Sequence, residues 1–543
     1  MPETPVERPA TVLFELEVPE PQRVYAAIRE LWAPELPRSA ELALGHVLGF
    51  GPLVATSFDV EAPFVAAYAQ NDEATSTGDW VFAARVRSGA ELAAQLTTGS
   101  SPSHHVEIVR GQPCLVASSS AASATGTSKP QAASPSIGTS KPRWPLGVTV
   151  FGNVAVFGGC ELNSSIGPYA AQGVAQRVAR AGAVRGRVTR GGLRSWMNEL
   201  LVERWSALRA QLESAARSDE LHRGRPADFA DPAGALAKLN RVVETVREFV
   251  GEASGLVFDV ERDGEFVKWH AFMEGQSPLW SKLKDRTVAV PSLIWSLPSD
   301  TAFAVSLQGL WQEPAAGKSA EQPGPALGIW GHRATPQQIA QLERAWNDVA
   351  GALTGEQTLG LRSGRIWVGT GQVQDASLLE RGLKGLFSGF SRPPLEGPLS
   401  ALLGKPTLIP ARKSPGGTQF RASFATTDRA QTQQLVVEVG SDRYWFASAA
   451  VPAGGSPAAD GPALSREPWV SNWMRQPQEA IATLYLNPAA LGGSARPAPG
   501  FVEFGLERGS PALWGSFSAA LIELARRAQL LPGAFPSNAG KGP

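Results

Sequence analysis

The stretch from residue 177 to residue 194 contains six arginines and no acidic residue. These arginines are the side chains best suited to binding a ligand. Each guanidinium can hold a carboxylate or a phosphate through two parallel hydrogen bonds, so the group could contact an anionic ligand or partner. No aromatic side chains are interleaved, and this pattern does not favour single-stranded nucleic acid. We favour a solvated strand or helix start whose charge is balanced by acids elsewhere in the fold. The six are Arg177, Arg180, Arg185, Arg187, Arg190 and Arg194.

Two short motifs resemble parts of known sites, and each lacks a residue that its chemistry requires. Residues 317–319, Gly-Lys-Ser, match the end of a phosphate-binding loop, but Gln312 stands where the loop needs its first glycine. The acids of segment 259–264 match the first half of a calcium loop, but His270 stands where a bidentate glutamate is needed. The sequence therefore predicts no cofactor and no bound metal.

Histidine and cysteine also give no complete metal or nucleophile pattern. The six histidines are scattered, and the adjacent pair His104 and His105 would point to opposite faces of a strand. Cys114 and Cys160 lack zinc-site spacing, and Cys160 is better explained as a small buried residue than as a nucleophile. The two could form one disulfide in an oxidising compartment, although the sequence leaves their pairing open. We predict no catalytic residues.

Composition excludes several classes of protein. Fifty basic and fifty acidic residues cancel, so the charge gives no reason to expect nucleic acid as a partner. No apolar run reaches the roughly 18 residues of a membrane span. The amino terminus has no apolar leader, which predicts a cytoplasmic protein if Met1 is the native start. If a leader is missing, the periplasm or cell envelope is expected instead.

The elements that would position any site are short hairpins and amphipathic helices. Tight turns at Gly152-Asn153, at Ser363-Gly364 and near Ser441-Asp442 predict hairpins at residues 148–157, 359–369 and 436–447. The apolar set Leu378, Leu379, Leu383 and Leu386 predicts the clearest helix after a hairpin. Four further helices are predicted to begin at Ser195, at Asp231-Pro232, at Thr335-Pro336 and at Ser510-Pro511.

The most specific local prediction is a hairpin at residues 256–272 with Asp263-Gly264 as a type I′ turn. That turn would place Arg262 opposite Glu265, Val260 opposite Val267 and Asp259 opposite Lys268. One face of the hairpin would then be apolar up to the charged pair at its tip.

A repeated strand pattern indicates internal duplication. Alternating segments begin at Thr11, Thr301 and Ala482, and Leu297-Pro298-Ser299-Asp300 precedes the second. In these residues the chain resembles uncharacterised bacterial envelope proteins, of the domain-of-unknown-function kind, whose units open with a Leu-Pro-x-Asp-Thr strand. The resemblance covers a small part of the chain. It implies an extracytoplasmic setting and no known activity.

We therefore predict an α+β protein of two related halves, each an antiparallel sheet with helices packed on one face. The first half would span residues 8–292 and contain a disordered insertion at 118–142, which consists almost wholly of Ser, Ala, Thr, Gly, Pro and Lys. The second half would span residues 293–531, with flexible ends at 1–7 and 532–543.

The sequence predicts no single function, and we rank three candidate functions. The first expectation is a non-catalytic scaffold or protein-interaction protein, because no complete site accompanies the repeats and the sixteen tryptophans. The second is a carrier of an apolar or amphipathic small molecule in a cavity between sheet and helices. The third is an enzyme whose site is assembled from residues distant in sequence. An unknown protein partner is the partner we expect first.

Overall fold

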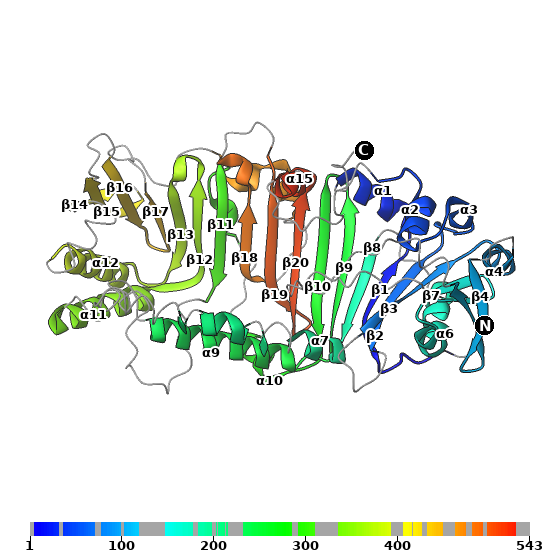
Figure 1. Cartoon of the computed structure of the whole chain (residues 1–543). Coiled ribbons are helices and arrows are strands. Elements are labelled where there is room, and N and C mark those ends of the chain that lie inside the picture. Colours follow the sequence, from blue (N-terminus) through cyan, green and yellow to red (C-terminus); the bar gives the residue numbers. More distant parts are fainter. Residues whose placement is uncertain are drawn as a thin grey trace. The chain divides into compact units, whose positions relative to one another are not determined.

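The structure is a computed structural model of the whole chain (Figure 1). It describes residues 5–31, 36–70, 78–98, 103–118, 147–176, 183–197, 202–203, 205–211, 213–214, 232–284, 292–309, 335–392, 405–414, 416–425, 432–448, 462–473, 480–491 and 497–527. The described elements include twenty strands, and their pairings are antiparallel, so the predicted α+β class is confirmed. The chain forms two compact units. Unit 1 is Met1–Glu199, Val250–Gly275 and Ala525–Pro543, and unit 2 is Leu200–Phe249 and Gln276–Leu524.

Unit 1 holds strands β1 to β10. Their order across the sheet is β4-β5-β6-β7-β3-β2-β1-β8-β9-β10. The bounds are β1 Val12–Val18, β2 Phe64–Gln70, β3 Gly78–Arg85, β4 His104–Val109, β5 Gln112–Ala117, β6 Gly147–Phe151, β7 Val154–Gly158, β8 Ala183–Thr189, β9 Gly255–Asp263 and β10 Phe266–Glu274.

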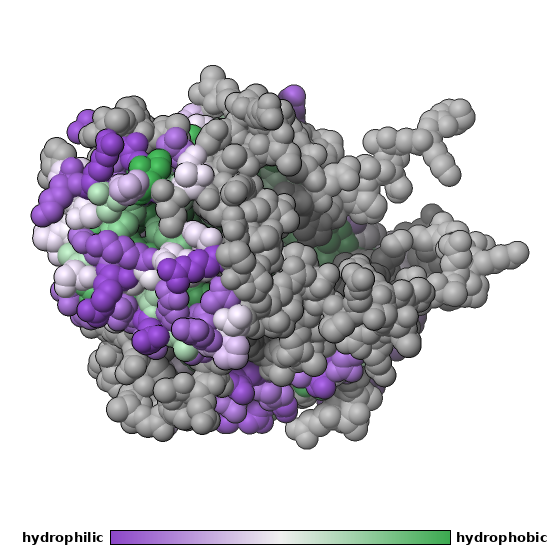
Figure 2. All heavy atoms as spheres, turned by 90° about the vertical axis from the view of Figure 1, so that its left-hand side faces the viewer, coloured by the Kyte–Doolittle hydropathy of each residue, from purple (hydrophilic) through white to green (hydrophobic). Residues whose placement is uncertain are grey.

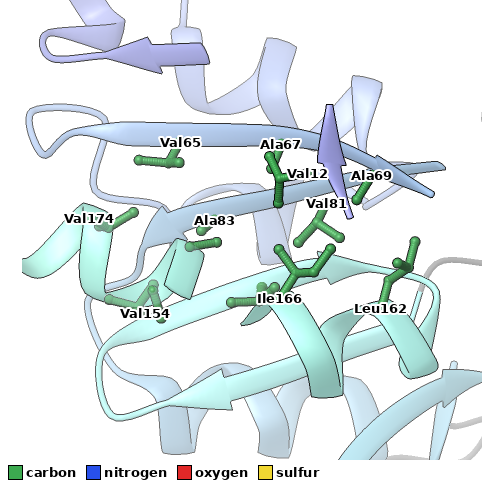
Figure 3. Packing of buried hydrophobic residues seen from close by; sticks show 13 residues of the cluster. Val12, Val65, Ala67, Ala69, Val81, Ala83, Val154, Leu162, Ile166 and Val174 are labelled. Carbon is green, nitrogen blue, oxygen red and sulfur yellow. The ribbon is translucent and has the colours of Figure 1, made fainter. Parts of the chain in front are cut away.

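Helices cover both faces of the sheet in unit 1, which corrects the prediction of helices on one face. Helix α6 (Cys160–Gln176) places Leu162 and Ile166 against Val81 and Val154 (Figure 3). The opposite face packs against α1 (Pro21–Leu31), α2 (Ala40–Val47), α3 (Pro52–Ala55) and α4 (Gly89–Thr97). Strands β2, β3 and β7 are apolar on both sides, so each face needs a cover.

Unit 2 holds strands β11 to β20, in the order β14-β15-β16-β17-β13-β12-β11-β18-β19-β20. The bounds are β11 Thr301–Gln308, β12 Leu353–Arg362, β13 Trp367–Val373, β14 Lys405–Ser414, β15 Gly417–Ala425, β16 Thr432–Val439, β17 Arg443–Ala447, β18 Ala480–Leu486, β19 Gly500–Glu507 and β20 Ser510–Ser518.

The two faces of the sheet in unit 2 have different covers. Val437 of β16 packs with α11 (Pro336–Ala352) and α12 (Ala376–Phe390). The adjacent Val436 points the other way and packs with η2 (Ile294–Ser296), η4 (Leu464–Arg466) and α14 (Pro468–Trp473). Figure 2 views the α11–α12 side, where hydrophilic residues predominate among the coloured atoms, with smaller hydrophobic areas between them. The apolar side chains of both helices therefore serve mainly to hold them on the sheet.

The three predicted hairpins are confirmed as β6–β7, β12–β13 and β16–β17. Gly152 and Gly364 take the positive φ values, 63° and 72°, that their turns require. The predicted helices at residues 232, 336 and 376 are confirmed as α9 (Pro232–Gly251), α11 and α12. Thr335 and Gln338 form a capping box that fixes the start of α11.

The predicted hairpin of β9 and β10 exists, but the predicted register is wrong. Asp263 faces Phe266, so Gly264 and Glu265 are the central residues of the turn. Gly264 alone has positive φ, at 60°, which is the type II′ arrangement with glycine first. Arg262 consequently faces Val267 and binds Glu30 through two hydrogen bonds of 2.6 and 2.8 Å. Each residue still points to its predicted face, because the partner shifts by two residues.

Two predicted helix starts are wrong. Helix α7 (Arg190–Met197) begins before Ser195, because the Thr189 hydroxyl accepts a hydrogen bond from the Gly192 backbone N–H and caps it. Residues 510–518 form strand β20 instead of a helix, and α15 (Ala519–Arg527) follows. Arg508 and Gly509 both have positive φ, which closes a hairpin with β19. Hydrogen bonding to β19 therefore stabilises a strand here, although the spacing of Leu513, Trp514 and Phe517 predicts a helix.

Further described elements are α10 (Pro278–Lys284), η3 (Ser363–Arg365) and η5 (Pro488–Ala490), and residues 205–211 are also helical. Most of the predicted insertion at 118–142 and the whole of segment 317–319 lie outside the described residues.

Candidate ligand-binding face

The six arginines of the sequence motif do not form one cluster in the described chain. Arg185 and Arg187 lie on β8 and pair with Asp259 at 2.9 Å and Glu274 at 2.5 Å. Arg190 and Arg194 lie on α7, while Arg177 and Arg180 lie outside the described residues. Two of the four described guanidiniums are thus held by acids of β9 and β10, which reduces their capacity to bind an external anion.

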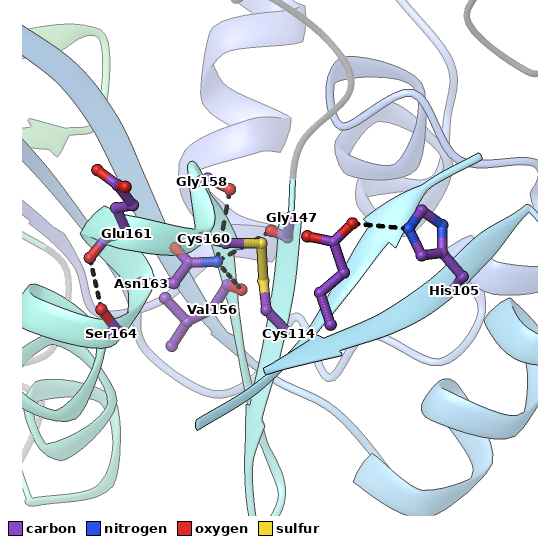
Figure 4. Close-up of a disulfide and its surroundings, with 10 residues drawn as sticks. His105, Cys114, Gly147, Val156, Gly158, Cys160, Glu161, Asn163 and Ser164 are labelled. Atoms are coloured by element: carbon purple, nitrogen blue, oxygen red, sulfur yellow. Dashed lines mark hydrogen bonds and ion pairs between the residues drawn. A yellow bond between two sulfur atoms is a disulfide. The ribbon is translucent and has the colours of Figure 1, made fainter. Parts of the chain in front are cut away.

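His104 and His105 point to opposite faces of β4, as predicted. The His104 ring is buried beside Ser103 and Phe50, and burial lowers its pKa. The His105 ring is exposed and lies 2.9 Å from Glu107 (Figure 4). Among the described residues no group of three or more His, Cys, Asp or Glu side chains is arranged to hold a metal ion.

Cys160 forms a disulfide with Cys114, which ties β5 to the first residue of α6 (Figure 4). A Cβ atom on Gly147 would lie 2.3 Å from the sulfur of Cys160, so only glycine leaves room for the bond. The buried Asn163 amide donates to the carbonyl oxygens of Gly147 at 3.0 Å and Val156 at 3.3 Å. This is a structural crosslink and not a free nucleophile.

Two buried carboxylates have structural partners. Glu15 accepts hydrogen bonds from Arg8 at 3.0 Å and from the Tyr169 hydroxyl at 2.5 Å. Burial and then this hydrogen bond raise the pKa of Tyr169. Glu356 is 1% exposed and accepts hydrogen bonds from the backbone N–H groups of residues 292, 293 and 294. Both side chains fasten chain segments that are distant in sequence.

A third carboxylate, Glu503 on β19, gives a pH-dependent prediction. Burial raises its pKa above the ordinary 4.5, against hydrogen bonds from Trp514 and Thr483 that lower it. The folded state therefore holds the proton more tightly than the unfolded state, and stability is lost as the pH rises from 4.5 through the raised pKa. We expect Glu503→Gln to be more stable than the wild type at neutral pH. The difference in free energy of unfolding should shrink as the pH falls through that window. Denaturant titrations from pH 4 to pH 8 would measure it, and a pH-independent difference would contradict the assignment.

The most distinctive surface is an apolar sheet face in unit 2, which we call the open face. It comprises three cross-strand rows over six strands, defined by the observed register. The rows are Trp367-Leu361-Phe303-Leu486-Gly500-Phe517, Gly369-Leu359-Val305-Leu484-Val502-Gly515 and Gly371-Gln357-Leu307-Ala482-Phe504-Leu513.

The open face is incompletely covered and contains no ionisable residue. Leu359, Trp367 and Leu513 are 37%, 43% and 40% exposed. Phe303, Val305 and the other large members are half-buried. Helices α11 and α12 cover the neighbouring part of the same face, around Leu353 and Val373. An exposed apolar area next to such a helical border is typical of a binding surface.

The opposite face of the same strands is buried and carries both apolar and polar side chains. Ala304, Val368 and Tyr485 belong to the core that packs with η2, η4 and α14. Thr483, Ser306, Thr358 and Thr370 form one cross-strand row there, each at most 3% exposed. Apolar side chains therefore occupy both faces of these strands, although the open face is only partly covered. The partly exposed apolar face was not predicted from the sequence. The signal was present in β11, where the bulky Phe303, Val305 and Leu307 alternate with Ala302, Ala304 and Ser306.

No protein-family model, no curated protein and no solved structure matches the chain. No helix within the described part of the chain is long and apolar enough to cross a membrane.

Proposed function

We propose that this protein binds the acyl chain of a lipid or fatty acid on the open face of unit 2, without transforming it. The observation that carries the proposal is the half-exposed apolar face, which holds eighteen register positions and no charged residue. This is the carrier function among the sequence-based expectations. The ligand would lie on an open sheet face and not in a closed cavity.

Charge and hydrogen bonding select the class of ligand. The backbone groups of β11, β12, β18 and β19 are used in ladders on both sides, so the face offers no unpaired strand edge to a polypeptide. Its side chains are aliphatic or aromatic, apart from the buried Gln357. Protein interfaces usually add Tyr, Arg and a polar rim. An acyl chain needs none of these, and each methylene removed from water contributes about 0.8 kcal/mol.

A glutamate on the open face should weaken binding. Leu359→Glu and Leu513→Glu each place a carboxylate where the chain would lie, and its desolvation should raise the Kd for cis-parinaric acid at least about tenfold. Both side chains are already part-exposed, so folding should survive. The measurement is the polyene fluorescence of the bound fatty acid.

Leu53→Glu is the matched control, because Leu53 is 73% exposed on α3 of unit 1. It should bind the probe as the wild type does. Equal affinity in all four proteins, or no saturable binding by the wild type, would overturn the proposal.

A scaffold or protein-interaction function is the second candidate. It is favoured by Val106 and Ile108 on edge strand β4, which are 56% and 69% exposed. Strand edges pair with other polypeptide chains, and exposed apolar side chains beside such an edge strengthen the pairing.

The disulfide supports a setting outside the cytoplasm. Bonds such as Cys114–Cys160 persist in oxidising compartments and are rare where thiols are kept reduced. The same setting is implied by the resemblance of segment 297–301 to bacterial envelope proteins. We propose the cell envelope as the site of action.

We also infer that units 1 and 2 arose by duplication. Adding ten to each strand number in the order of unit 1 gives the order of unit 2. Helices α4 and α12 both follow the third strand of their unit, and α6 and α14 both follow the seventh. The predicted repeats at Thr11 and Thr301 begin the first strand of each unit, whereas the third, at Ala482, lies in the eighth strand of unit 2.

A further inference from the structure

Strand β4 ends the sheet of unit 1 without the usual protection of an edge. Among the described strands it pairs only with β5. It contains no proline, lysine or arginine, and Val106 and Ile108 are largely exposed. The outermost strand of unit 2, β14 (Lys405–Ser414), in contrast contains Pro410, Arg412 and Lys413. Natural proteins use proline and basic residues to prevent an edge strand from pairing with another chain. Their absence from β4 indicates that this edge can pair.

The geometry of the hairpin shows which backbone groups face outward. Arg110 and Gly111 have φ values of 51° and 78°, which define a two-residue type I′ turn. Val109 and Gln112 close that turn as a hydrogen-bonded pair, and such pairs alternate along an antiparallel ladder. The bond from Ser118 N to Ser103 O, at 2.8 Å, continues the same alternation. The backbone groups of His104, Val106 and Ile108 therefore point away from β5.

We propose that β4 pairs with β4 of a second copy of this chain, antiparallel and centred on Val106. In this register His105 faces Glu107 of the partner subunit, and Glu107 faces His105 of the partner subunit. Both pairs are of the non-hydrogen-bonded kind, in which side chains approach most closely. His105 and Glu107 already interact within one strand, at 2.9 Å. The strand can therefore form the same histidine–carboxylate hydrogen bond with a second copy of itself.

Other registers lose this match. Centring the pair on Glu107 would place two carboxylates opposite each other, which is unfavourable. The proposed register also lets the outward groups of His104, Val106 and Ile108 form up to six backbone hydrogen bonds. Each contributes only about 0.5–1.5 kcal/mol net, and association itself costs at least about 4 kcal/mol. The dimer should therefore be weak and best populated at submillimolar protein.

Cysteine crosslinking tests the register with a matched control. Val106→Cys brings two thiols together across the two-fold axis, at a Cα separation of about 5.5 Å that suits a disulfide. Ile108 is at least as exposed as Val106, but in Ile108→Cys each thiol lies about 13 Å from its own copy along the strand. Under mild oxidation we expect a covalent dimer of Val106→Cys and little dimer of Ile108→Cys on a non-reducing gel.

Sedimentation of the uncrosslinked protein supplies the second readout. The wild type should show a dimer that grows with concentration, and Val106→Pro should remain a 57.4 kDa monomer. Proline removes an outward N–H that the hairpin itself does not use. Equal crosslinking of both cysteine variants, or a wild type that stays monomeric at submillimolar concentration, would overturn the proposal. Binding of fatty acid to unit 2 is measured independently, so either proposal can fail alone.

Discussion

Replacing Glu356 by alanine should lower the free energy of unfolding by about 3–5 kcal/mol. The carboxylate accepts hydrogen bonds from Ser292 N at 2.7 Å, Leu293 N at 2.9 Å and Ile294 N at 3.2 Å, and from the Ser306 hydroxyl at 2.7 Å. Alanine leaves three backbone N–H groups without their acceptor in a site that is 1% exposed. The segment that carries Ile294 and Trp295 onto the sheet would lose its anchor.

Two further variants make the reason testable. Glu356→Gln keeps the shape but turns one acceptor into a donor that meets other donors, so it should destabilise by a smaller amount. Glu380→Ala, at a half-buried glutamate of α12, should change stability by less than about 0.5 kcal/mol. Denaturant unfolding gives all three values. A Glu356→Ala protein as stable as the wild type would contradict the role of this carboxylate.

Removing the disulfide should have an effect of similar size in unit 1. The bond closes a loop with a sequence separation of 46 residues, for which the chain-entropy model gives about 4 kcal/mol at 25 °C. We expect this loss for the double variant Cys114→Ser, Cys160→Ser. Hydrogen exchange should rise in β5, β6 and the first turns of α6, where the crosslink joins the elements.

Reductant provides the internal control for this prediction. It should destabilise the wild type and leave the double-serine protein unchanged. Unit 2 contains neither cysteine, so exchange in β11 and β12 should not respond. A wild type indifferent to reductant would mean that the bond contributes nothing to folding.

Local turn chemistry explains why much of the fold could be predicted from sequence. Gly152 and Gly364 sit at positions that need positive φ, and the strands flanking Gly152 are rich in valine, a residue that favours strands. Helix α11 could be predicted from Thr335, Pro336 and Gln338 alone. Where two turns fit the same residues the prediction was wrong. Gly264 can stand second in a type I′ turn or first in a type II′ turn, and only the paired strands decide.

The candidate site could not be predicted, because it depends on pairings between distant strands. The open face joins β11 to β12, β18, β19 and β20, which are spread over more than two hundred residues. Alternation reveals that Phe303 and Val305 share a side, but it does not show which side is covered. The same limit affected residues 510–518, whose helical spacing was outweighed by pairing with β19.

Photocrosslinking with a fatty acid that carries a diazirine at the far end of its chain would show whether an acyl chain binds on the open face. Mass spectrometry of the crosslinked peptides identifies the residues that touch the chain. We expect adducts concentrated in β11, β12, β18 and β19, around Val305, Leu359 and Leu484. Adducts found mainly in unit 1, or no adduct that excess unlabelled fatty acid can prevent, would contradict the proposal.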